Sequence, residues 1–320
     1  MRGLAGSVVA AAALAAAVMA TSVDAGAACD GSTAAVIAGV DMQVMSAVHR
    51  VELGGGAVSF DSARIAGSSA LVRAVLHDDA SATQAVVQRI VYHHYWHIVR
   101  LRVTDARGRL LADFGGPDVI SPVPGILQSA DGRTIGHFLM SVQDDAGFVK
   151  LEHRFIGDPV GIYRHGVLVV GVPSTVPRRL PLSGRVSFGG VSSLISSQEF
   201  GAFPSGTLRL SLLVAERSGA EAARPCALVA VDELGNVAAH LARLFNPLPR
   251  HYGPYAQTVG IYTGALVFVR DGATQLATTA GAGPPTLPTR GTVSYLGTSW
   301  AVFSFEPRPP ARIYLLVRRT

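Results

Sequence analysis

The sequence is poor in charged residues and in cysteine. Asp, Glu, Lys and Arg make up 15% of its 320 residues, against about 25% in an average soluble protein, and there are 2 cysteines. An intrinsically disordered chain needs few apolar residues and a high net charge, so a hydrophobic content of 49% excludes that class. A disulfide-rich miniprotein, collagen and a coiled coil are excluded by the same counts. The length suggests about two domains.

Several functional signatures are also missing. The formal net charge is +5, but the basic residues are scattered and no aromatic–basic recognition motif appears, which indicates no nucleic-acid partner. After residue 30 no uncharged apolar stretch reaches the roughly 20 residues that a membrane-spanning helix needs. There is no G-x-S-x-G, H-E-x-x-H, C-x-x-C or Walker motif, so we expect no enzyme activity and no cofactor.

The N-terminus has the pattern of an export signal. A basic start precedes an apolar run from Val8 to Ala20, and small residues stand at Ala25 and Ala27. We predict a signal peptide over residues 1–27, a mature start near Ala28, and a secreted or cell-envelope, extracytoplasmic location. An uncleaved N-terminal anchor is the alternative.

Hydrophobic periodicity predicts helices first and strands afterwards. Helical spacing covers Asp30–Val51, roughly Asp61–Leu76, and a stretch from Ser81 to about Tyr95. The period then changes to that of half-buried strands. Antiparallel strands are predicted over Ile98–Thr104, Arg109–Phe114 and Thr134–Gln143, and over Phe148–Phe155 after a turn at Asp144–Gly147.

The second half of the sequence contains an internal repeat. Three segments recur in the same order: VGIYRHGVLVVG (Val160–Gly171) as VGIYTGALVFV (Val259–Val269), LPLSGRVSF (Leu180–Phe188) as LPTRGTVSY (Leu287–Tyr295), and RLSLLV (Arg209–Val214) as RIYLLV (Arg312–Val317). We interpret the chain as a duplicated helix-plus-sheet unit, with extra material between about Leu53 and Pro159 in the first copy. The predicted domains are residues 28–217 and 218–320.

Three segments between the helices and the repeat resemble a known family. IVRLRVTDARGRLLADFGG (Ile98–Gly116), VISPVPGIL (Val119–Leu127) and GRTIGHFLMSVQDDAGF (Gly132–Phe148) are similar to the extracytoplasmic Cache, or PDC, sensor domains. The resemblance implies an α+β fold: N-terminal helices followed by a PAS-like antiparallel sheet, here with a second, smaller repeat of a helix plus antiparallel strands. It also implies binding of a small metabolite, and a membrane-bound signalling partner.

The resemblance suggests where a ligand would bind. Pockets of the family use residues just before the first strand and on the central strands, which here are His94, Tyr95, Arg100, Arg102 and His137. An arginine in such a place can hold a carboxylate through two hydrogen bonds, so a small anionic metabolite is the expected ligand. The alternative for Arg100 and Arg102 is a solvent-facing strand edge. The aromatic–Arg–aromatic signature of amino-acid-binding members does not occur in matching order.

Two further side-chain sets have open interpretations. His93 and His97 are four residues apart, a spacing that chelates a metal on a helix, with His137 or His153 as a further ligand. Packing at a helix end is the alternative that we prefer, and we predict no metal site. Cys29 and Cys226 each precede a helical stretch and could form a disulfide. The alternatives are acylation of Cys29 and two free thiols.

The sequence therefore predicts an exported, sensor-like protein that binds a small metabolite without turnover. A structural or adhesive cell-envelope protein with a protein-binding surface is the second hypothesis. A polar pocket between the helices and the strand Ile98–Thr104 would favour the first, and a filled apolar core there would favour the second.

Overall fold

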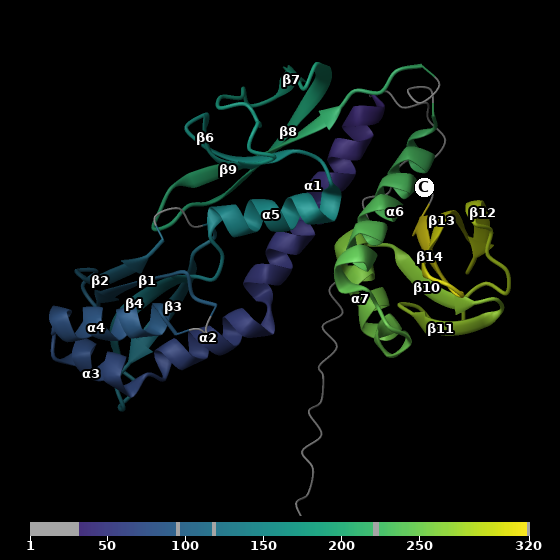
Figure 1. Ribbon diagram of the computed structural model, residues 1–320. Coiled ribbons are helices and arrows are strands. Elements are labelled where there is room, and N and C mark those ends of the chain that lie inside the picture. Colours follow the sequence, from purple (N-terminus) through teal and green to yellow (C-terminus); the bar gives the residue numbers. More distant parts are fainter. Residues whose placement is uncertain (1–31, 94–96, 117–119, 220–223, 319–320) are drawn as a thin grey trace, which may run out of the picture.

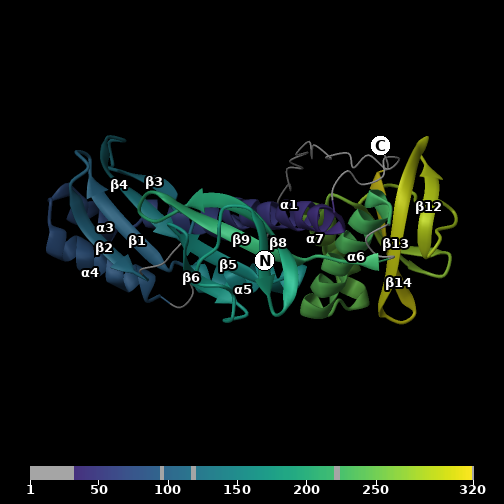
Figure 2. The same ribbon diagram turned by 90° about the horizontal axis from the view of Figure 1, so that it is seen from above.

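Three antiparallel sheets follow one another along an elongated molecule, and each sheet packs against helices (Figures 1 and 2). The structure is a computed structural model that describes residues 32–93, 97–116, 120–219 and 224–318. The predicted signal peptide, His94, Tyr95 and Cys29 lie outside the described residues. The α+β prediction is confirmed.

The first sheet has four strands in the order β2-β1-β4-β3. Alternate residues of β1 face the helices, where Leu101 and Val103 are fully buried among apolar side chains. The helices are α2 (Gly56–Ala66), α3 (Ser69–Leu76) and α4 (Ala80–Val91), and the strands are β1 (Arg100–Asp105), β2 (Leu110–Gly115), β3 (Val123–Gln128) and β4 (Thr134–Ser141).

The second and third sheets have five strands each and the same topology. Their orders are β6-β5-β9-β8-β7 and β11-β10-β14-β13-β12, so each strand of one sheet has a counterpart in the other. The strands are β5 (Val160–Arg164), β6 (Val167–Val172), β7 (Gly184–Phe188), β8 (Val191–Gly201) and β9 (Thr207–Ala215), then β10 (Leu266–Asp271), β11 (Thr274–Thr278), β12 (Arg290–Tyr295), β13 (Thr298–Arg308) and β14 (Ala311–Arg318).

The helices repeat in the same way. A long helix contacts the fourth and fifth strands of each sheet, and a shorter helix contacts the first and second. The long helices are α1 (Thr33–Gly54) and α6 (Cys226–Phe245), and the shorter ones are α5 (Asp145–Ile156) and α7 (Tyr252–Thr263), with a 3-10 turn η2 (Pro249–His251) before α7. This matching order supports the predicted duplication, whereas the boundary at residues 217 and 218 stays a prediction.

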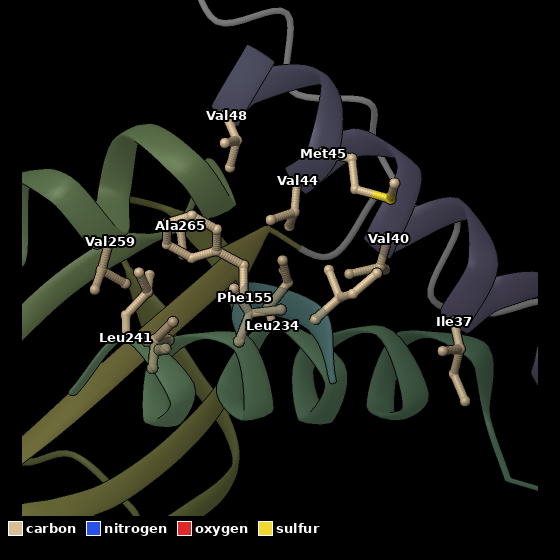
Figure 3. Packing of buried hydrophobic residues seen from close by; sticks show 14 of the residues in the cluster. Ile37, Val40, Val44, Met45, Val48, Phe155, Leu234, Leu241, Val259 and Ala265 are labelled. Atoms are coloured by element: carbon tan, nitrogen blue, oxygen red, sulfur yellow. The ribbon is translucent and has the colours of Figure 1, made fainter. Parts of the chain in front are cut away.

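Helix α1 joins the two copies. The Ser32 side chain accepts a hydrogen bond from the backbone N–H of Ala35 and caps its first turn. Its apolar residues then meet α6 and α7 in one continuous core, in which Val40, Val44 and Val48 face Leu234 and Leu241 (Figure 3).

The prediction of a strand over Phe148–Phe155 is wrong, because this segment lies in helix α5. The apolar alternation also fits helical spacing, with Phe148, Val149, Phe155 and Ile156 buried on one face. The ends decide the outcome: the carboxylate of Asp144 caps the N-terminus, and Gly157 ends the helix with φ 86°. Because α5 has its counterpart in α7, the extra material in the first copy ends near residue 144 rather than at Pro159.

The two copies of one sequence repeat do not occupy equivalent positions in the structure. Val160–Gly171 forms the β5–β6 hairpin, but Val259–Val269 forms the end of α7 and β10. The counterpart of β5–β6 is β10–β11, and the pairs that close the two turns are Arg164 with Val167 and Asp271 with Thr274. Identical tetrapeptides thus form a strand and a helix, since tertiary packing outweighs local propensity.

Two of the remaining expectations concern export. No helix in the described part of the chain is long and apolar enough to cross a membrane. Cys226, at the start of α6, is disulfide-bonded. The pairing of Cys226 with Cys29 stays a prediction.

Candidate functional site

The first sheet has one apolar and one polar face. Arg100, Arg102 and Thr104 alternate along β1 with the buried Leu101 and Val103. The polar residues therefore point away from helices α2 to α4.

This placement corrects the expected position of the pocket. The space between the helices and β1 is filled by apolar side chains, among them Leu71, Val75 and Val87. A cavity of about 610 Å³ lies instead on the opposite face of the sheet. The side chains alternate along a strand, and the sequence alone did not tell which of the two faces is left open.

Two of the predicted ligand-binding residues meet at this cavity. Arg102 and His137 both line it, together with Thr104, which lies opposite His137 in the β1–β4 pairing. The hairpin between β8 and β9 supplies Pro204 and Ser205 on the other side. The cavity therefore lies between two sheets that are far apart in the sequence.

Arg100 does not line the cavity but supports its wall. Its guanidinium donates two hydrogen bonds to the carboxylate of Asp113 on β2, from Nε at 2.9 Å and from Nη2 at 3.0 Å. Nη1 donates to the carbonyl oxygen of Gly116 at 3.2 Å, and the guanidinium lies over the Phe203 ring, 4.6 Å from its centre. Arg100 thus holds the first sheet to the β8–β9 hairpin.

Arg102 shares its counter-ion, the carboxylate of Asp113, with Arg100. Its Nη1 donates to the same Asp113 carboxylate at 3.2 Å, and its side chain is 31% exposed, against 18% for Arg100. In the described part of the chain, two guanidinium groups thus border the single carboxylate of Asp113. A positive charge next to a cavity favours an anionic ligand.

The hairpin is fixed to the first sheet by backbone contacts close to the cavity. Ile120 pairs with Ala202, and the N–H of Ser121 donates to the carbonyl oxygen of Gly201 at 2.8 Å. The Ser121 hydroxyl contacts the ring of His49 on α1. Burial, followed by the charge of Arg50, lowers the pKa of His49 to about 4, so His49 is neutral at pH 7.

The histidines considered as metal ligands, all within the described residues, are not arranged as a metal site. Helix α4 ends at Val91, so His93 and His97 do not share one helical turn. The ring of His153 is on α5, with its Nδ1 2.8 Å from the carbonyl oxygen of Asp158. No three His, Cys, Asp or Glu residues in the described ranges are grouped so that they could hold a metal ion.

Sequence reasoning missed the partners of the two arginines. Asp113 carried a signal, because it stands on the strand that follows Arg100 and Arg102 through a short turn. No sequence pattern pointed to Phe203, Pro204 and Ser205, because these residues reach the site only through the packing of the second sheet on the first.

Comparison with known proteins does not assign a family. No family model matches the chain, and no curated protein matches it. Among solved structures, it is similar to the periplasmic domain of Vibrio cholerae LuxQ, with 9% identity over 57% of this chain and 98% of that one and a TM-score of 0.33.

Two other similar structures are also extracytoplasmic or ligand-binding domains. One is an extracellular ligand-binding receptor from Desulfohalobium retbaense, with 10% identity, coverage of 56% of this chain and 39% of that one, and a TM-score of 0.31. The other is the ligand-binding domain of the Pseudomonas fluorescens chemoreceptor CtaA in complex with L-serine, with 10% identity, coverage of 57% and 93%, and a TM-score of 0.29. TM-scores below 0.5 do not establish a family for this chain.

Proposed function

We propose that this protein is an extracytoplasmic, sensor-type binding protein that holds a small anionic metabolite in the cavity between the first sheet and the β8–β9 hairpin. The observation that carries the proposal is Arg102, which lines a cavity of about 610 Å³ and shares its counter-ion with Arg100. This volume is within the range of small-molecule sites, roughly 300–1,000 Å³.

The lining residues support binding rather than turnover. Among the described residues of the cavity wall, Arg102, Thr104, His137 and Ser205 are polar, and none is a carboxylate or a cysteine. These groups can donate hydrogen bonds to an anion. The second side of the cavity belongs to the β8–β9 hairpin, whose strands contact helix α1. A ligand would thereby bias the position of α1, which a membrane-bound partner could detect.

One observation favours the second hypothesis, a structural or adhesive protein. Apolar side chains fill the space between β1 and the helices, where the first hypothesis expected a polar pocket. In that case the polar face of the sheet would contact a protein, and no small molecule would stabilise the chain.

A thermal-shift screen of the mature protein distinguishes these hypotheses. We expect a small carboxylate to raise the unfolding temperature by several °C at about 100 times its Kd, because ligand binding adds about 2.7 kcal/mol of stability at that concentration. The Arg102→Gln variant should lose the shift, while Arg107→Gln, on an exposed turn of the same sheet, should keep it. No shift from organic acids, amino acids or divalent metals with a folded sample would contradict the proposal.

Asp113 should weaken anion binding by neutralising Arg102. We expect Asp113→Asn to increase the affinity for the carboxylate found in that screen by roughly fivefold, because the removed negative charge lies next to the cavity. The measurement is isothermal titration calorimetry at low salt. An unchanged or lower affinity in an Asp113→Asn protein that unfolds at the parent's temperature would contradict this prediction.

A further inference from the structure

The second sheet contains a buried arginine that pairs with no carboxylate among the described residues. Arg209 on β9 is 7% exposed. Its Nη1 donates to the carbonyl oxygen of Pro181 at 2.9 Å, its Nη2 donates to that of Leu180 at 2.7 Å, and its Nε has no hydrogen-bond partner in the described part of the chain. A buried charge without a counter-ion is unfavourable, so an anion next to it would be stabilising.

A cavity of about 280 Å³ lies beside Arg209. Its wall includes Tyr163, His165, Leu180, Glu199 and Thr207. The Tyr163 ring lies under the guanidinium, 5.2 Å from its centre, and the Tyr163 hydroxyl donates to the carbonyl oxygen of Pro177 at 2.8 Å. Arg209 is therefore held on two sides while it borders the cavity.

The size and charge of this cavity restrict what it can hold. Glu199 lies directly opposite Arg209 in the β8–β9 pairing, but no ion pair joins these two described residues. The carboxylate of Glu199 disfavours a dianion, so a monoanion is the better match for a single guanidinium. A planar carboxylate also fits the edge of a guanidinium, and the volume admits a molecule of only a few heavy atoms.

The third sheet provides a comparison. Arg270 on β10 is 6% exposed, and its Nη atoms donate to the carbonyl oxygens of Pro284 and Pro285, while its Nε has no partner among the described residues. The Phe268 ring and the Nη2 atom of Arg270 both lie close to Gly283, and the Phe268 ring packs edge to face against that of Tyr295 at 5.9 Å. Both arginines hold the loop before the third strand of their sheet, but Arg209 also lines a cavity.

We propose that the cavity beside Arg209 is a second binding site, separate from the one between the sheets, and that it binds a small monocarboxylate through the part of the Arg209 guanidinium that borders the cavity. The loop carbonyls of Leu180 and Pro181 position Arg209, and the ligand supplies the missing negative charge. Thr207 is two residues before Arg209 on the same strand, on the same face, and can donate a hydrogen bond to the same carboxylate.

The direct test is an NMR titration of the arginine Nε–H signals of the mature, ¹⁵N-labelled protein with sodium acetate at constant ionic strength. The Arg209 signal is assigned by its absence in Arg209→Lys. We expect a saturable shift of this signal with a Kd in the millimolar range, since acetate has only four heavy atoms. The Arg270 signal should not move, and sodium chloride and sodium sulfate should give smaller shifts of Arg209.

A second variant keeps the test valid if Arg209→Lys does not fold. Thr207→Glu places a carboxylate beside Arg209, so we expect a higher unfolding temperature and at least tenfold weaker acetate binding. Thr274→Glu, at an exposed position of β11, controls for the added charge and should change neither. The proposal is overturned if acetate gives no saturable shift at Arg209, if sulfate binds more tightly than acetate, or if Thr207→Glu binds acetate like the parent protein.

Discussion

Replacing Asp41 by Asn should stabilise the protein at pH 8 and change its stability little at pH 5. Asp41 lies on α1 at 0% exposure, inside the core between α1 and α6, and neither of its carboxyl oxygens has a hydrogen-bond partner in the described structure. Burial, and then the charges of Glu233 and Asp158, raise the pKa of Asp41 to about 10. The folded protein therefore keeps a proton on Asp41 that the unfolded chain releases near pH 4.

Asp41 belongs to a group of three carboxyls from three segments. Burial, and then Asp158, raise the pKa of Glu233 on α6 to about 7, and burial also raises the pKa of Asp158. The charge of Arg217 lowers the pKa of both Asp158 and Glu233, that of His153 lowers the pKa of Asp158, and that of Asp232 raises the pKa of Glu233. The Asp158 carboxyl lies near enough to Asp41 to interact with it, though outside normal hydrogen-bond geometry.

The direction of the pH effect follows from proton binding. A carboxyl whose folded-state pKa is raised holds more protons in the folded state, so its favourable contribution is complete below about pH 4 and is lost as pH rises toward the folded pKa. Each such group lowers the stability by about 1.4 kcal/mol per pH unit in that interval. For Glu233 the interval ends near pH 7, and for Asp41 it continues to about pH 10.

The Asn variant should therefore gain roughly 4 kcal/mol relative to the parent between pH 5 and pH 8, three pH units at the slope given above. At pH 5 the gain is offset by burying an amide without partners, which costs about 1–3 kcal/mol. The measurement is urea unfolding at both pH values. Asp271→Asn, at an exposed position, should show no such difference. A parent protein as stable at pH 8 as at pH 5 would contradict the shared burial of these carboxyls.

Local patterns predicted much of the fold because they are properties of short segments. The polar–apolar alternation from Ile98 to Thr104 became β1, and the Ala- and Val-rich periodicity before Val51 became most of α1. The repeat indicated two related units, since LPLSGRVSF and RLSLLV stand on strands that correspond to those of their copies. Where a segment satisfied two periods, as at Phe148–Phe155, only the caps at Asp144 and Gly157 distinguished helix from strand.

The candidate sites were less predictable because they depend on contacts between distant segments. Arg102 and His137 were found, since they share a sheet, but the hairpin residues Pro204 and Ser205 have no sequence signal that links them to it. Arg209 occurs in a recognised repeat, yet its lack of a counter-ion becomes visible only once the loop carbonyls and Glu199 are placed around it. A duplicated sequence shows that two units fold alike, whereas the cavity in one of them is a property of packing.

The two long helices allow a matched test of how the copies are assembled. Each contains a glycine, Gly39 in α1 and Gly235 in α6. A Cβ at Gly39 would meet no atom within 4 Å, so Gly39→Ala should stabilise the protein by about 0.5–1 kcal/mol through helix propensity alone. A Cβ at Gly235 would lie 2.2 Å from the Phe303 ring of β13, which is 7% exposed.

Gly235→Ala should therefore destabilise the protein by about 1–3 kcal/mol, as expected for overpacking a core. The matched change in α1, Gly39→Ala, should have the opposite effect. Phe303→Leu removes the ring atoms in question, so the double variant Gly235→Ala/Phe303→Leu should lose less stability than the sum of the single changes. Urea unfolding of the four proteins gives the coupling. If Gly235→Ala were neutral or stabilising, α6 would not lie directly on β13. Helix α6 contacts both α1 and β13, so it links α1 to the third sheet. Without a close α6–β13 contact, a shift of α1 caused by ligand binding would not be transmitted to the third sheet.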